Sequence, residues 1–565
     1  MNGGSERVRF WKYCAVFGVE ILLFEILWLP LSMSLNAFGF CDWGANLTVQ
    51  YLISHGYRPA VDFGYLYGLL SVFAGQVWLG LLGNTPDAYE AWVIVCNLLI
   101  AVALARIAAR LRFGPFAIAI MVVGIGYGVQ ETYPNFAHAL EALLVCTALA
   151  EQTLGNRPKA LMLSSAAVLA KPSMGYFYSL FLLILIASEL RGRSSDRIRA
   201  FARALIPTTI LFAALVILLV LDFGLIPFAH TVLPLTGMKV YRNRHFGFFT
   251  GTGSRFWYDP TKSWFYYFGT VAGFWIFETV YLLAAAIASV RRRLTGSELS
   301  ARDELIITCA LLHVTFVTLF FGNRWSWGYY SYLPLIGVAA AVDIGPAYRR
   351  LAAALVMVAV ISWIPPGFFF KELWTTHIRS AATAGLWASP GQAKEWVRAL
   401  DSVRGKRAVV LESRGAADLL FPGFGRPTGL YLVPGLTLPA EMQRRFDQIA
   451  SAELLVVPLG DPPCYGTPRV PRIHALLKNF APLWKGKFFE VLQNRSDRVG
   501  PGHGERARRI DDGLQAGVCA GGRHLERRCL RFLARQRRRD QSCSVSARSF
   551  SPMIMAPSAA ECLTG

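Results

Sequence analysis

The stretch CDWGANLTVQYLISHGYRPAVDFGYLYG, residues 41–68, follows directly on the first long apolar run of the chain. It places two aspartates, Asp42 and Asp62, just beyond a run that is long enough to cross a bilayer. Charged side chains are costly in lipid, so carboxylates beside a membrane exit need a structural or a chemical reason. Which reason applies depends on how the rest of the chain is arranged around this stretch.

The composition predicts an all-α polytopic membrane protein. Of the 565 residues, 54% are hydrophobic and only 16% are charged, and the mean hydropathy is +0.39. The formal net charge of +21 would favour a nucleic-acid partner in a soluble protein, but membrane proteins use Lys and Arg to fix their orientation. We therefore expect no nucleic acid. The ten cysteines contain no CxxC pair, so no metal site or disulfide framework is expected.

About 11 transmembrane helices are predicted, since each span needs about 20 apolar residues. The first follows a basic start and no cleavage site follows it, so it is expected to stay uncleaved. With this count the short basic loops all face the side of the N-terminus, which we expect to be cytoplasmic in a bacterial inner membrane. The predicted spans are 13–35, 90–111, 114–131, 136–153, 158–170, 174–190, 204–229, 264–290, 304–322, 328–345 and 350–370.

This orientation depends on residues 65–83, which must not cross. They are predicted to form a helix that lies on the periplasmic surface or re-enters from it. The alternative is an ordinary span and a total of twelve. A second apolar stretch is interpreted as two short helices that meet at Lys171-Pro172, because proline breaks the backbone ladder, and this puts Lys171 near the outer face.

Three parts of the chain are distinguished by composition. Residues 1–370 form the transmembrane domain, and 371–497 mix polar sequence with helix-like and strand-like segments, which predicts a small extracytoplasmic α/β domain. Residues 498–565 carry thirteen Arg and no Lys. This tail is either a disordered basic segment or the product of a shifted reading frame, and the second interpretation is favoured because no such skew appears upstream.

The predicted outward-facing loops combine carboxylates with cations that break the positive-inside pattern. Cations on that side need a partner, and the simplest is the phosphate of a lipid. The reaction type that uses both groups transfers a sugar from a lipid phosphate to a hydroxyl, with a carboxylate as general base and cations on the departing phosphate. The candidate residues are Asp42, Asp62, Glu131, His138, Lys171, Arg242, Arg244, His245, Arg255 and Arg324.

Residues 41–70 resemble the first outer loop of the GT-C superfamily of polyprenyl-phosphate-dependent glycosyltransferases. The branch in question includes lipid A and lipopolysaccharide core transferases and protein O-mannosyltransferases. Asp42 matches the aspartate that is the family's presumed base, GYRPAVDF at 56–63 puts Asp62 on a second acidic position, and AKP at 170–172 resembles a Lys-Pro turn of related transferases. The resemblance implies an inverting transferase with a periplasmic active site that uses a polyprenyl-phosphate sugar.

Two positions depart from the family pattern. Trp43 stands where many relatives have a second acid, and Leu69 replaces the proline of a Tyr-Gly-Pro-Leu signature. The first departure weakens a paired-carboxylate or metal role at this position, so no cofactor is assigned and a divalent cation is left as an open alternative. The likeness spans roughly residues 13–190, and beyond them it is architectural only.

Each candidate also has a structural interpretation. Asp42 could cap the helix expected at 45–55, and Asp62 could stabilise the turn after Pro59. Lys171 could extend to the interface, and the later arginines could bind lipid headgroups without specificity. Glu131 and His138 could be solvated loop residues.

Two other functions are alternatives to sugar transfer. A transporter or flippase of lipid-linked glycans would share the aromatic loops and cationic patches, but the inverted repeats typical of transporters are not visible. The third alternative is a scaffold whose α/β domain binds a partner. The acceptor of the sugar is expected to be a glycan, a lipid or a protein.

Overall fold

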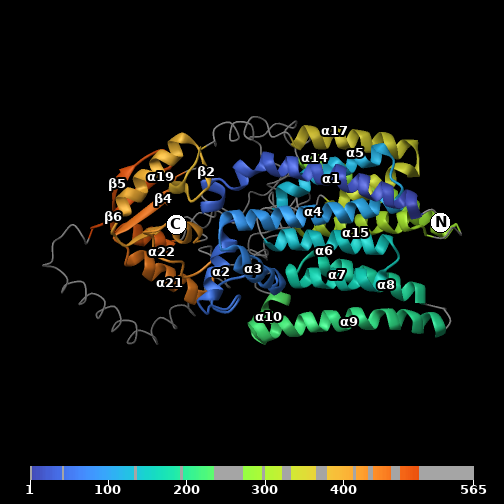
Figure 1. The fold of residues 1–565 in the computed structure, drawn as a ribbon, viewed down its shortest axis with the longest axis horizontal. Helices are drawn as coiled ribbons and strands as arrows, with labels where there is room; N and C mark the ends of the chain where they lie inside the picture. The colour runs from blue at the N-terminus through green and yellow to red at the C-terminus, as the bar shows by residue number, and fades with distance from the viewer. Residues whose placement is uncertain are drawn as a thin grey trace, which may run out of the picture. The chain divides into compact units, whose positions relative to one another are not determined.

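The computed structural model describes residues 3–40, 43–132, 136–190, 195–233, 271–295, 299–320, 332–363, 378–411, 415–430, 437–459 and 471–495. Met1–Asn494 form one compact unit. Helices make up most of its described part, and strands appear after residue 377 (Figure 1). The predicted tail at 498–565 lies outside the described residues.

Long helices account for most of the described chain up to residue 363. Local signals set their limits. At the start of α4 the Thr85 hydroxyl accepts the Ala88 N–H at 3.2 Å and Pro86 occupies the first turn, while Arg112 ends the helix with φ 54°. The helices are α1 (Gly3–Ser32), η1 (Leu35–Gly39), α2 (Ala45–Ser54), α3 (Leu69–Leu82), α4 (Pro86–Leu111), α5 (Pro115–Thr132), α6 (Phe136–Thr153), α7 (Arg157–Ala170), α8 (Met174–Leu190), α9 (Ser195–Phe223), α10 (Leu225–Val232), α14 (Val271–Leu294), α15 (Ala301–Phe320), α16 (Tyr332–Ala341), η2 (Val342–Ile344) and α17 (Pro346–Trp363).

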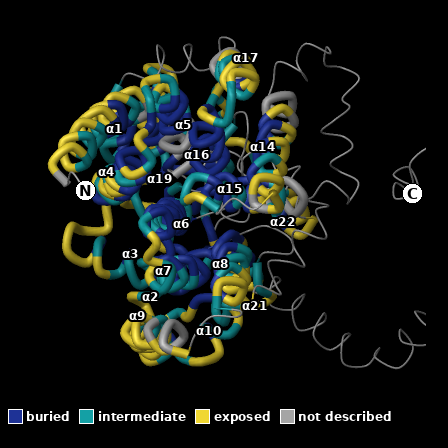
Figure 2. The backbone as a smooth tube through the Cα atoms, turned by 90° about the vertical axis from the view of Figure 1, so that its right-hand side faces the viewer, coloured by how far each residue is buried: buried dark blue, intermediate teal, exposed yellow. Residues whose placement is uncertain are grey.

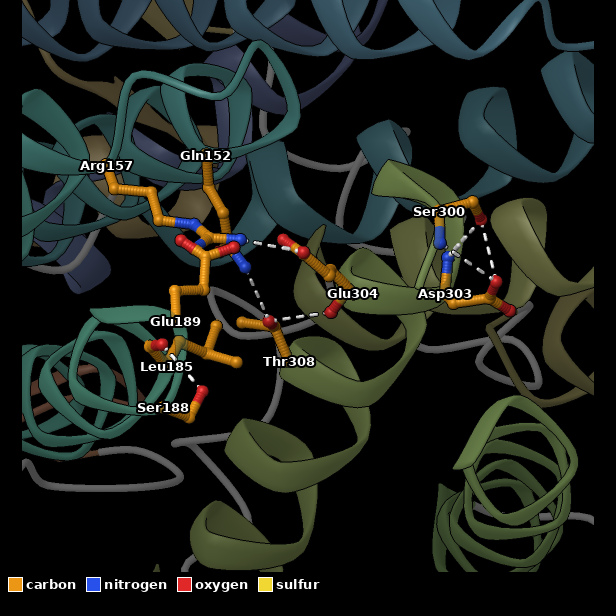
Figure 3. Close-up of polar contacts among 9 residues, drawn as sticks. All are labelled: Gln152, Arg157, Leu185, Ser188, Glu189, Ser300, Asp303, Glu304 and Thr308. Carbon is orange, nitrogen blue, oxygen red and sulfur yellow. Dashed lines mark hydrogen bonds and ion pairs between the residues drawn. The ribbon is translucent and has the colours of Figure 1, made fainter. Parts of the chain in front are cut away.

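Ion pairs join the basic loops at one end of the helices, which we call the charged end. Arg157, which begins α7, donates to Glu304 of α15 at 2.8 Å and also pairs with Glu189 of α8 (Figure 3). Arg302 pairs with Asp343 in η2. The loops that the sequence assigns to the cytoplasmic side are therefore neighbours in the fold.

The opposite end, which we call the loop end, holds the 43–68 segment and the turn after α7. The Gly68 N–H donates to the Ala170 carbonyl at 2.9 Å, and Asn84 Nδ2 donates to the Leu47 carbonyl at 3.1 Å. Because α3 lies between Gly68 and Asn84, it starts and ends at the loop end. This is the arrangement that a helix within 65–83 has if it does not cross a membrane.

The helices differ strongly in burial. All of α16 is buried, whereas α9 lies at the edge and is largely exposed (Figure 2). Two described helices, Pro86–Leu111 and Phe201–Phe223, are long and apolar enough to cross a membrane, judged by length and composition alone. The apolar and largely exposed surface of α9 suits a lipid environment. The number of crossings stays a prediction.

One predicted span was wrong in its extent. The apolar run 204–229 was expected to form a single helix, but the structure ends α9 at Phe223 and begins α10 at Leu225. Gly224 lies between them with φ 90°, a conformation that side chains rarely allow. Hydrophobicity continues through the break, so a count of apolar residues does not detect it.

The chain after residue 377 combines helices with a four-stranded sheet of order β3-β4-β6-β5, in which only β3 and β4 are parallel. The fully buried Trp396 of α19 packs on Phe421 and Phe489. The elements are β1 (Ile378–Arg379), η3 (Ala381–Thr383), β2 (Trp387–Ala388), α19 (Pro390–Val403), β3 (Ala408–Val410), α20 (Ala416–Leu420), α21 (Pro439–Ala450), β4 (Leu454–Pro458), α22 (Pro471–Leu477), β5 (Phe480–Lys485) and β6 (Phe489–Asn494).

Candidate functional site

The start of the 43–68 segment lies beside the start of α6. Asn46 Nδ2 donates to the Trp43 carbonyl at 2.8 Å, and Asn46 Oδ1 accepts the Phe136 N–H at 3.1 Å. One buried amide side chain thus joins two segments that are 90 residues apart. Asp42 lies outside the described residues, directly before Trp43 in the chain.

Asp62 closes a turn within the same segment. Its Oδ2 accepts the Arg58 backbone N–H at 2.8 Å and Arg58 Nε at 3.0 Å. Partial burial raises the pKa of Asp62, but the hydrogen bonds and charge of Arg58 outweigh it and lower the pKa below its usual range. The side chain of Asp62 is 31% exposed, so its carboxylate is ionised and already bound within its own turn.

The end of the segment passes closely over the end of α7. The Gly68 N–H bonds to Ala170, and a Cβ atom on Gly68 would stand 2.0 Å from the Leu169 carbonyl oxygen. Tyr67 meets the His138 ring edge to face, with 5.6 Å between ring centroids. Residues 67 and 68 therefore connect α6 with the turn that begins at Lys171.

The close approach at Gly68 predicts a destabilised Gly68→Ala variant. The added methyl group collides with a backbone atom, which cannot rotate away, so we expect a loss of about 1–3 kcal/mol or more and a lower melting temperature. Thermal unfolding of the purified protein in detergent measures this. Gly80→Ala is the matched control, because Gly80 lies in α3 with open space around it. Equal melting temperatures for the two variants would contradict the close packing.

A buried ion pair occupies the turn after α7. Lys171 Nζ lies 3.6 Å from Glu141 Oε2, and the two side chains are 11% and 1% exposed. Glu141 Oε1 also accepts Ser173 Oγ at 2.5 Å and the Met174 N–H at 3.2 Å. We call Tyr67, His138, Glu141, Lys171 and Ser173 the Lys171 cluster.

Two opposing effects set the pKa of Lys171. Burial lowers the pKa of Lys171 to about 8, while the neighbouring Glu141 acts in the opposite direction. The ammonium group is therefore held at the loop end by one carboxylate in a poorly hydrated place. Such a cation attracts an anion more strongly than a fully solvated lysine does.

The structure brings together some of the predicted site residues. His138 is linked to the Lys171 turn through Tyr67 and the adjoining Gly68, whereas Asp62 is bound in the separate turn with Arg58. Glu131 lies in the last turn of α5, and its side chain is outside the described part. Outside the described residues lie Asp42, Arg242, Arg244, His245, Arg255 and Arg324.

The start of α2 bears on the helix-capping role considered for Asp42. Gly44 occupies the N-cap position of α2, so Asp42 lies two residues before the place from which a cap normally acts. Only the N-cap side chain commonly bonds to the first free N–H groups of a helix. The assignment of Asp42 as the general base stays a prediction.

Three members of the Lys171 cluster were missed by sequence analysis. Glu141, which lies inside an apolar run, was given no role, and neither were Tyr67 and Ser173. A usable signal existed for Glu141, because it lies three residues after His138 and therefore on the same face of α6. Nothing in the sequence marks its pairing with Lys171.

Metal binding receives no structural support in the described part of the chain. Within it, no group of three or more His, Cys, Asp or Glu side chains is arranged to hold a metal ion. A divalent cation therefore remains an untested alternative.

No protein-family model and no curated protein matches the chain. Among solved structures, it is similar to the crystal structure of ArnT from Cupriavidus metallidurans bound to undecaprenyl phosphate. The likeness covers 86% of this chain and 98% of that chain, with 12% sequence identity and a TM-score of 0.42. A likeness at this level identifies no activity and assigns no role to any residue.

Proposed function

We propose that the chain is an integral membrane glycosyltransferase of the GT-C type. It moves a sugar from a polyprenyl-phosphate donor to a hydroxyl of an envelope glycan, lipid or protein. Its place is the bacterial inner membrane, with a cytoplasmic N-terminus and with the residues after 377 on the outer side. Membrane lipids, the lipid-linked sugar and the acceptor are its partners.

The convergence at the loop end is the observation that carries this proposal. The 43–68 segment contains Asp62, follows Asp42 directly in the chain and is part of the stretch that resembles the superfamily's first loop. Its Gly68 is bonded to the residue before Lys171. The buried Lys171 and the segment that follows the expected base in the chain therefore lie at the same end of the helices. Sugar transfer from a lipid phosphate needs this combination of groups.

The proposed step is an inverting displacement at the anomeric carbon of the donor sugar. The carboxylate of Asp42 takes the proton of the acceptor hydroxyl, whose oxygen attacks the anomeric carbon from the face opposite the phosphate. The bond between that carbon and the phosphate oxygen breaks, and polyprenyl phosphate departs as an anion. Lys171 stabilises the anion, and the same role is proposed for Arg242, Arg244, His245, Arg255 and Arg324.

The turn closed by Asp62 and Arg58 is proposed to position the chain for this step without taking part in it directly. Asp62 holds Arg58 and thereby the path of the chain toward Gly68. Glu131 and His138 are proposed to contact the substrate from α5 and α6. Tyr67 packs on the ring of His138 and would hold it in place for this contact.

The lowered pKa of Lys171 predicts a pH effect on donor use. The charged form attracts phosphate, so we expect transfer at low donor concentration to fall as the pH rises through about 8. Unfolding does not explain such a loss: the pKa is lower in the folded than in the unfolded state, so this group adds stability as the pH rises above 8. A profile that stays flat to about pH 10 would argue against Lys171 as the phosphate ligand.

Purified protein in proteoliposomes with a panel of polyprenyl-phosphate sugars tests the function itself. Radiolabel that moves covalently to an acceptor supports the proposal. Movement of intact lipid-linked sugar across the bilayer, without covalent transfer, would replace it with the transporter function. Chelation with EDTA in the same assay decides whether a divalent cation takes part.

A further inference from the structure

The residues after 377 reach back to the 43–68 segment through one helix, α21. Glu441 and Arg444 lie one turn apart on α21 and bond to backbone groups on either side of Phe63. Glu441 Oε2 accepts the Gly64 N–H at 2.8 Å, and Arg444 Nη2 donates to the Asp62 carbonyl at 2.5 Å. The chain separation between Glu441 and Gly64 is 377 residues.

Glu441 is buried at this contact and accepts several hydrogen bonds there. It is fully buried and also accepts the N–H groups of Leu430 at 2.5 Å and Leu438 at 3.1 Å. A Cβ atom on Gly429 would stand 2.4 Å from the Glu441 Cγ, so glycine leaves room for the side chain there. A buried carboxylate that accepts several backbone N–H groups fixes those groups tightly.

The contact continues from Phe63 to the Lys171 cluster. Phe63 is fully buried in a hydrophobic cluster that includes Leu430 and Leu169. Four residues after Gly64, the Gly68 N–H bonds to Ala170, and Tyr67 in between packs on His138. The path of this short stretch is thus fixed by α21 at one end and by α7 at the other.

We propose that Glu441 is a positioning residue for the site at the loop end. By holding the Gly64 N–H, it sets the path of residues 64–68 and with it the place of Tyr67 beside His138 and Lys171. The catalytic consequence rests on the proposed function, while the structural consequence does not. The residues after 377 then act as part of the site's framework rather than as an independent binding module.

Glu441→Gln in the full-length protein tests this proposal. The substitution keeps the shape but replaces one acceptor oxygen with an NH₂ group, which cannot accept the N–H groups that Oε2 now binds. We expect backbone hydrogen exchange in residues 57–68, followed by mass spectrometry, to accelerate by about 10-fold or more. At saturating donor, the transfer rate should fall by up to about 10²-fold through misplacement.

Glu395→Gln is the matched control. Glu395 on α19 also accepts three backbone N–H groups, from Lys487, Phe488 and Phe489, but none from the 43–68 segment. We expect it to lower the melting temperature without changing exchange in 57–68 or the transfer rate. If Glu441→Gln fails to fold, Arg444→Met replaces it, because it removes the bond to the Asp62 carbonyl.

The outcomes separate the two proposals. Unchanged exchange of residues 57–68 in Glu441→Gln, or an equal acceleration in Glu395→Gln, overturns the positioning role. Accelerated exchange in Glu441→Gln, together with a wild-type protein that transfers no sugar, would support the positioning contact and reject the glycosyltransferase. Accelerated exchange together with unchanged transfer shows that the contact does not serve the reaction, and it overturns the role as proposed.

Discussion

Lys171→Met is expected to lower the free energy of unfolding by about 3–5 kcal/mol and to abolish sugar transfer. The lysine is the cation beside the buried carboxylate of Glu141, at 3.6 Å. Without it, Glu141 loses this cation, while Ser173 and the Met174 N–H, which also donate to its carboxylate, are neutral. Thermal unfolding in detergent and the radiolabel assay measure the two effects.

The double variant Lys171→Met/Glu141→Gln separates stability from function. It removes the uncompensated carboxylate, and replacing a whole buried ion pair is often neutral for stability. We therefore expect the melting temperature to recover while transfer stays lost. If transfer returned together with stability, Lys171 would be a packing residue and the phosphate role would be wrong.

Asp42→Asn is expected to fold like the wild type and to transfer sugar about 10²- to 10⁴-fold more slowly. The substitution keeps the size of the side chain and removes the ability to take a proton from the acceptor hydroxyl. Initial rates of radiolabel transfer at saturating donor measure this loss. Donor binding should change little, because the base acts on the acceptor.

Asp87→Asn is the control for a lost negative charge at the same end of the protein. Asp87 lies in the first turn of α4, its side chain is 76% exposed, and it pairs with Arg379 at 2.6 Å. Exposed pairs contribute little, so neither stability nor transfer should change measurably. Full activity of Asp42→Asn would remove Asp42 as the base. A loss of the same size in Asp87→Asn would point to surface charge instead.

Sequence analysis anticipated many element limits because they depend on local chemistry. The helix PGQAKEWVRALDSV is α19, Pro390–Val403, and its amphipathic spacing predicts it directly. The two short helices that meet at Lys171-Pro172 are α7 and α8. β5 is hard to recognise in the sequence, because its exposed residues, Pro482 and an irregular register interrupt the alternation on which strand recognition depends.

The candidate site was only partly predictable. Lys171 and His138 were identified because charged and polar side chains near the ends of apolar runs stand out one by one. Glu141 was not assigned, since its role comes from a partner 30 residues further along the chain. Asp62 stands out equally well in the sequence, but the structure shows its carboxylate bound to Arg58.

By itself, the sequence determined where the apolar helices run and which basic loops are neighbours, because hydrophobicity and charge accumulate locally along the chain. Only the tertiary structure decided that Glu441 holds Gly64 and that Gly68 rests on Ala170. Those contacts join residues far apart in the chain, and each depends on backbone groups that every residue carries. No pattern of residue types can therefore reveal them before the chain is folded.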